Sequence, residues 1–70
     1  MTPRDREFVD ALNLRLGAEV VMSASIGRNR DGLLWVMSAM RDGRACELHV
    51  RPPLDVESVA ERIDRWRRGE

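Results

Sequence analysis

His49 and Cys46 are the residues whose side chains could most readily act as a general base and a nucleophile, and each is the only residue of its type. Such a pair can perform nucleophilic catalysis only when the two side chains lie within hydrogen-bonding reach. Residues 44–51 alternate apolar and polar side chains like a strand, and residues three apart on a strand point to opposite faces. The spacing therefore predicts a buried Cys46 and a surface His49, with no catalytic dyad.

No other arrangement of residues predicts catalysis, a metal site or a cofactor. One cysteine and one histidine cannot supply the four ligands of a structural zinc site. The carboxylates are dispersed and mostly stand beside arginines, as in residues 4–7 (RDRE), which is typical of solvated faces with weak ion pairs. The glycines fit turns, and no glycine-rich phosphate loop precedes a helix. We therefore expect a protein that is not an enzyme and that uses no metal or cofactor.

The elements that would position these side chains begin with a helix predicted over residues 3–16. Thr2 fits its N-cap, Pro3 fits its first position, and Gly17 fits a left-handed C-terminal cap. A second helix is predicted after Asp55, which fits an N-cap. The apolar stripe of that helix consists of Val56, Val59, Ala60, Ile63 and Trp66.

Three strands are predicted between the helices, over residues 19–27, 33–41 and 44–51. Two Asp-Gly pairs, at 31–32 and 42–43, separate them and supply the positive φ that tight hairpins need. The prolines at 52–53 end the third strand because neither can donate to a ladder. The sequence therefore predicts one α+β domain over residues 1–70. Its order is α-β-β-β-α, with a three-stranded antiparallel meander sheet and both helices packed on one face.

The middle strand is apolar on both of its faces, so the register of the two hairpins decides which face is buried. Type I′ turns at both Asp-Gly pairs would place Trp35 and Met37 in the core. A bulge at both turns would turn the strand over and expose Trp35 and Met37. The type I′ register defines a set of candidate protein-binding residues on the face away from the helices: Leu34, Val36, Met40, Val21 and His49.

This second face would be exposed unless the helices divide, one on each side of the sheet. A contiguous apolar patch on a small domain usually marks a contact, here with a protein partner or with a second copy in a homodimer. An inert exposed face is the remaining alternative. We expect a non-enzymatic protein-interaction module that binds stoichiometrically. Small domains without motifs are common among phage accessory proteins and inhibitors of host defence, including anti-CRISPR proteins, so such an inhibitor is one expected role.

The arginines favour an alternative function, that of a small nucleic-acid-binding protein. All twelve basic residues are arginine, and twelve acidic residues balance them. The overall charge therefore gives no general attraction to nucleic acid or to an anionic membrane. Arginines near the C-terminus also complement the negative end of the last helix dipole. The candidate phosphate-contacting residues are Arg41, Arg44, Arg62, Arg65, Arg67 and Arg68.

The predicted order of elements resembles that of the double-stranded RNA-binding domain over the whole chain, and this resemblance implies a nucleic-acid partner. The second helix of that family opens with a lysine-rich segment that grips phosphates, whereas residues 55–58 read Asp-Val-Glu-Ser here. The family's proline-histidine loop between the first two strands is replaced by residues 28–32 (RNRDG). These two departures remove the residues that would bind duplex RNA in that way.

The sequence predicts a cytoplasmic protein. Its first residues are charged and lead into no apolar segment of the kind found in a signal peptide. No run approaches the ~20 apolar residues needed to span a bilayer. A lone cysteine fits a reducing compartment.

Overall fold

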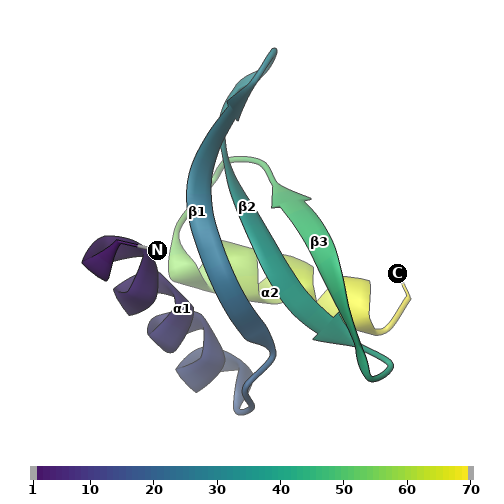
Figure 1. Cartoon of the computed structure of the whole chain (residues 1–70). Helices are drawn as coiled ribbons and strands as arrows, with labels where there is room; N and C mark the ends of the chain where they lie inside the picture. The colour runs from purple at the N-terminus through teal and green to yellow at the C-terminus, as the bar shows by residue number, and fades with distance from the viewer. Residues whose placement is uncertain (1, 70) are drawn as a thin grey trace.

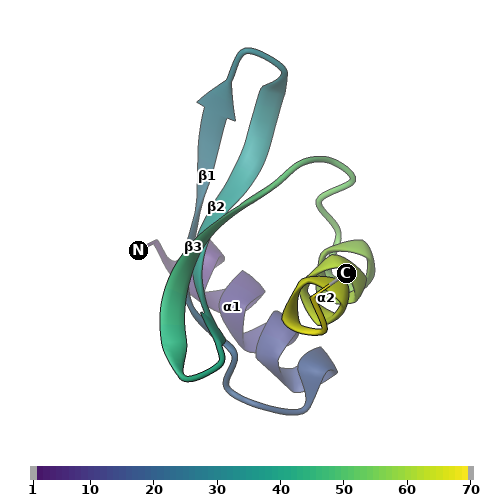
Figure 2. The ribbon, with the colours of Figure 1, turned by 90° about the vertical axis from the view of Figure 1, so that its right-hand side faces the viewer.

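The computed structural model describes residues 2–69 and has the order α1 (Pro3–Leu16), β1 (Val21–Asn29), β2 (Gly32–Arg41), β3 (Arg44–Val50) and α2 (Val56–Arg67). The strands form one antiparallel sheet in the order β1-β2-β3. Both helices lie on the same side of this sheet (Figures 1 and 2). The predicted α+β class, the meander and the shared helix face are confirmed, and helices leave the other side of the sheet uncovered.

Local capping explains where α1 begins and ends. The Thr2 hydroxyl accepts a hydrogen bond from the Asp5 backbone N–H at 3.2 Å, and the Asp5 carboxylate accepts one from the Thr2 N–H at 3.1 Å. This reciprocal capping box satisfies two backbone donors that would otherwise lack partners. Gly17 follows the helix at φ 77°, a left-handed conformation that glycine adopts at little cost. The predicted bounds of this helix are therefore confirmed.

The β2–β3 hairpin has the register of a type I′ turn. Arg41 pairs with Arg44, and the two turn residues, Asp42 and Gly43, have φ values of 52° and 76°. Two successive positive φ values define this turn type and match the twist of the flanking strands. Met37 of β2 consequently faces the helices and is 2% exposed. The alternative register, with a bulge at this turn, is wrong.

The β1–β2 hairpin departs from the predicted type I′ turn. Its turn residues are Arg30 and Asp31, and Asn29 pairs with Gly32 across them. The positive φ, 114°, falls on Gly32 after the turn. β1 therefore continues beyond its predicted end at residue 27. The pairing differs from the predicted one by two residues, so each side chain of this hairpin keeps its face.

A β-bulge interrupts β1 near its start, where the register shifts between Val21 and Ser23. Val21 pairs with Ala39 and is 3% exposed, whereas Met22 is 58% exposed. The prediction that Val21 lies on the face away from the helices is therefore wrong. The bulge is the reason, because one extra residue in the ladder reverses the alternation that precedes it.

The core lies between the sheet and the two helices. Phe8 of α1 stacks on Trp35 of β2 with ring centroids 4.1 Å apart, and the Trp35 indole N–H donates to the Leu54 carbonyl at 3.4 Å. Trp66 is half-buried at the edge of the core, with the Arg41 guanidinium 5.5 Å from its ring. The buried core residues are Val9, Leu12, Val20, Val21, Ala24, Trp35, Met37, Ala39, Val50, Val59, Ala60 and Ile63.

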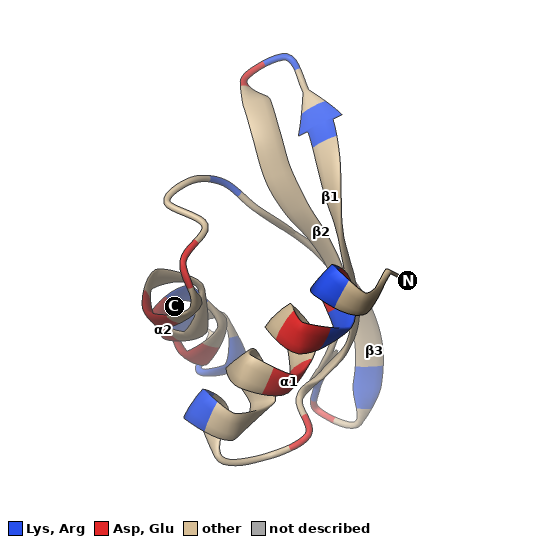
Figure 3. Cartoon of the chain, turned by 90° about the vertical axis from the view of Figure 1, so that its left-hand side faces the viewer, with Lys and Arg blue, Asp and Glu red and all other residues tan. Residues whose placement is uncertain are grey.

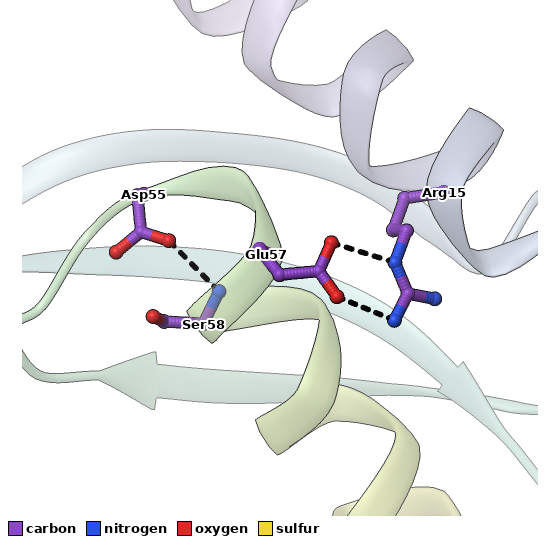
Figure 4. Close-up of polar contacts among 4 residues, drawn as sticks. All are labelled: Arg15, Asp55, Glu57 and Ser58. Atoms are coloured by element: carbon purple, nitrogen blue, oxygen red, sulfur yellow. Dashed lines mark hydrogen bonds and ion pairs between the residues drawn. The ribbon is translucent and has the colours of Figure 1, made fainter.

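An ion pair joins the two helices on the surface of the domain. Arg15 of α1 donates from Nε and Nη2 to the two carboxylate oxygens of Glu57 of α2, at 2.8 and 2.6 Å (Figure 4). These hydrogen bonds, reinforced by the arginine charge, lower the pKa of Glu57. At the start of the same helix, hydrogen bonding with Ser58 lowers the pKa of Asp55, whose carboxylate accepts from the Ser58 backbone N–H at 3.0 Å.

Stability is expected to fall in acid for this reason. A carboxylate whose pKa is lower in the folded chain stabilises the fold above its ordinary pKa, and that contribution is lost as the pH falls through the folded value. The urea midpoint should therefore decrease between about pH 5 and about pH 3. Glu57→Gln should show a smaller decrease than the wild type. An equal decrease in both proteins would contradict the assignment to Glu57.

Candidate protein-binding face

The side of the sheet that the helices leave uncovered is called the open face here. Strand pairing assigns its members, because Val36 of β2 stands between Ser25 of β1 and His49 of β3. Residues two positions away along each strand share this face. Its side chains are those of Ser23, Ser25, Leu34, Val36, Ser38, Met40, Ala45, Glu47 and His49.

A shallow hollow of about 460 Å³ lies on the open face. Val36 contributes apolar surface to it, and Glu47 contributes a carboxylate. The Val36 side chain also packs closely against Gly27, since a Cβ at position 27 would come within 2.9 Å of Val36 Cγ2. The remaining lining residues are small or contribute little side chain: Ser23, Ala24, Ser25, Met37 and Ser38. Short side chains around one valine therefore give the face its concave shape.

The predicted protein-binding residues are only partly brought together. Val36 and Met40 are half-buried on the open face, and His49 is exposed there. Leu34 belongs to the same face by register, yet it is only 2% exposed. Val21 lies in the core. The open face is consequently less apolar than the sequence predicts, because two of its five predicted residues are buried.

The serines of the open face are not among the predicted protein-binding residues, although the alternation of residues 19–27 places two of them on this face. Ser23, Ser25 and Ser38 shape the hollow and add three hydroxyl groups to it. The available signal was the alternation of serine with apolar residues over positions 21–26. Such an alternation indicates a strand with one polar, small-residue face.

Cys46 and His49 lie on opposite faces of β3, as predicted. Cys46 pairs with Ala39 on the helix side, where it is half-buried rather than buried as predicted, and its thiol donates to the Arg44 carbonyl at 3.9 Å. His49 Nε2 instead lies 3.4 Å from the Glu47 carboxylate on the open face, and both of these side chains are largely exposed. The imidazole therefore lies beside a carboxylate, and the thiol is on the other side of the sheet.

Among residues 2–69, no three His, Cys, Asp or Glu side chains are grouped so as to hold a metal ion. Across those same residues, neither helix has the length and apolar character needed to cross a membrane.

The turn of the β2–β3 hairpin and the end of α2 come together, as the nucleic-acid alternative requires. Arg41, Arg67 and Arg68 line a hollow of about 470 Å³ between them. Asp42 and Asp64 line the same hollow, so its charge is mixed rather than basic. Acidic and basic segments also occur together on both helices (Figure 3).

The other predicted phosphate-contacting arginines are placed differently. Arg62 lies in α2, and its guanidinium donates back to the Ser58 carbonyl of that helix at 3.2 Å and to the Arg51 and Pro53 carbonyls of the β3–α2 connection. Arg65 and Arg44 are exposed, and Arg65 lines a neighbouring hollow that shares Asp64 and Arg68 with the first and also contains Glu61. Carboxylates therefore lie among the arginines at the end of α2, and the Arg62 guanidinium is bound to backbone carbonyls.

Comparisons with known proteins give no identity. No family model, no curated protein and no solved structure matches this chain. Its function is inferred from its own residues and geometry. The open face offers an apolar centre, three hydroxyls, one carboxylate and one imidazole, a combination suited to contact with another protein surface.

Proposed function

We propose that this chain is a non-enzymatic protein-interaction module that binds a protein partner stoichiometrically through the open face. One observation carries the proposal: both helices cover one side of the sheet, and the other side keeps an accessible hollow around Val36. A protein interface typically has an apolar centre within a polar rim. Val36, with serine hydroxyls, Glu47 and His49 around it, has this composition.

The role that best suits such a module is that of a stoichiometric inhibitor. A domain that binds without a reacting group acts by occupying a surface of its partner. Small inhibitors of host defence, including anti-CRISPR proteins, act in this general way. The proposal therefore extends to a cytoplasmic inhibitor of a larger protein, and it names the surface through which that inhibitor would act.

Affinity capture from native cells tests the proposed function with a matched pair of variants. Val36→Glu places a charge at the centre of the open face, whereas Leu14→Glu adds the same charge at an 85% exposed position of α1. Wild type and Leu14→Glu should capture one protein, and Val36→Glu should capture at least about tenfold less of it, because central interface residues dominate affinity. Equal capture by all three proteins would contradict the proposal.

Two controls make this comparison decisive. Circular dichroism should show that Val36→Glu is folded, and Ser25→Arg, which fills the same hollow from an exposed position, replaces it if it is not. Each capture is repeated after nuclease treatment. Capture that disappears with nuclease would overturn the proposed function in favour of nucleic-acid binding through the hollow lined by Arg41, Arg67 and Arg68.

A further inference from the structure

The two edge strands of the sheet, β1 and β3, differ in how well their outward backbone groups are protected from pairing with another strand. An unprotected edge can pair with another strand, so proteins usually cover or interrupt it. At the β1 edge, the Asn13 side chain accepts from the N–H groups of Val20 and Val21 at 3.0 and 2.8 Å, and it donates to the Val21 carbonyl at 2.9 Å. The bulge at Met22 interrupts the same strand. β1 is therefore a protected edge over its first part.

β3 lacks these protections. It is seven residues long, it contains no proline, and its pairing with β2 runs without interruption from Arg44 to Val50. Within the part of the chain that the structure describes, one side-chain hydrogen bond reaches the backbone of β3, from the Cys46 thiol to the Arg44 carbonyl. A regular strand with a free edge is the template on which an additional strand forms.

The register fixes which backbone groups of β3 point outward. Arg41 and Arg44 flank a two-residue turn, and the pair that flanks such a turn exchanges hydrogen bonds. Along an antiparallel ladder, bonded and non-bonded pairs then alternate. The N–H and C=O groups of Arg44, Cys46, Leu48 and Val50 are therefore directed toward β2. Those of Ala45, Glu47 and His49 are directed away from the sheet and are available to another strand.

The side chains of β3 are self-complementary about Leu48. If a second β3 strand pairs antiparallel with this centre, Leu48 lies opposite Leu48 and Cys46 lies opposite Val50 on the helix side. On the open face, Glu47 lies opposite His49 twice, once on each side of the centre. The outward backbone groups of these same two residues would exchange the hydrogen bonds. A pairing centred on Glu47 would instead place two carboxylates directly opposite, which is unfavourable.

We propose that two copies of this chain pair antiparallel through β3, centred on Leu48, to form a twofold dimer with a continuous six-stranded sheet. The twofold axis is perpendicular to the sheet, so the helices of both copies stay on one side. The two open faces then join into a single surface. This inference goes beyond the proposed function and does not depend on it, because the dimer forms through backbone groups at the edge of β3, whereas the proposed partner occupies the hollow around Val36.

Sedimentation equilibrium tests the dimer with variants that change the charges of residues 47 and 49. The wild type should sediment at twice 8.0 kDa, about 16 kDa. His49→Glu would place one carboxylate opposite Glu47 in each of the two pairs, and it should raise the dissociation constant at least about tenfold. The double variant Glu47→Lys with His49→Glu recreates opposite charges across the edge and should restore the dimer. If the charge variants fail to fold, His49→Pro removes an outward N–H and should give a monomer.

The control for this experiment is Ser25→Glu, which alters the open face away from β3 and should leave the mass unchanged. A wild type that remains at 8.0 kDa at every concentration would overturn the dimer. Loss of the dimer in Ser25→Glu would also overturn pairing through β3, since it would place the contact on the open face. Neither result changes the capture experiment above, so failure of the dimer and failure of the proposed function are distinguishable.

Discussion

Replacing Met37 by alanine should lower the free energy of unfolding by about 2–5 kcal/mol. Met37 is among the largest fully buried side chains, and it stands at the centre of the sheet between Ala24 and Leu48. Its removal leaves a cavity that the flanking strands cannot fill without breaking their ladders. A chain of 70 residues has a small hydrophobic core, so the loss of stability should appear as a large decrease in the urea midpoint.

Met40→Ala is the matched control, because it makes the same substitution on the same strand but on the open face. Met40 is half-buried, and its loss should cost about 1 kcal/mol. The ratio of the two effects tests which face of β2 meets the helices. A loss at Met40 equal to or larger than the loss at Met37 would mean that the two faces are reversed.

Asn13→Ala should have the second largest effect, a loss of about 2–3 kcal/mol in the free energy of unfolding. One amide side chain satisfies three backbone groups, the N–H groups of Val20 and Val21 and the carbonyl of Val21. Alanine leaves all three without this partner at the point where α1 meets β1. Urea unfolding measures the loss, and hydrogen exchange should accelerate at the amides of residues 20 and 21.

Leu14→Ala provides the comparison for Asn13, since it alters the adjacent helical position at a side chain that is 85% exposed. Its effect should be within about 0.5 kcal/mol of zero. If Asn13→Ala were as mild as Leu14→Ala, the amide would not be holding the start of β1, and the contrast between a protected β1 edge and a free β3 edge would fail.

The parts of the fold that the sequence predicted correctly depend on local chemistry. The capping residues around α1 act within one turn, so they identify its ends without knowledge of the rest of the chain. Asp42-Gly43 forms a tight turn in isolation from the core, and it fixes the register of β2 against β3. The placement of Met37 inside and of Val36 outside follows from that turn.

The errors arose where a contact from another element of the fold decides the local structure. Asn13 of the preceding helix binds the segment next to the bulge at Met22. The alternation of side chains within β1 does not reveal this contact, so it could not predict the bulge. Arg62 was assigned to a basic surface, but its partners are carbonyls of the β3–α2 connection, whose path is set by the packed fold. The shape of the open face was missed for a similar reason, since a hollow appears only when strands are paired.

The most direct test of a protein-binding open face is site-specific photo-crosslinking in native cells. A photoreactive amino acid is placed at Val36, at the centre of the open face, and separately at Leu14 on the far side of α1. Position 36 should yield a discrete crosslinked protein, and position 14 should yield none. A crosslink from position 14 with none from position 36 would contradict the proposed interface and place the contact on the helix side of the domain.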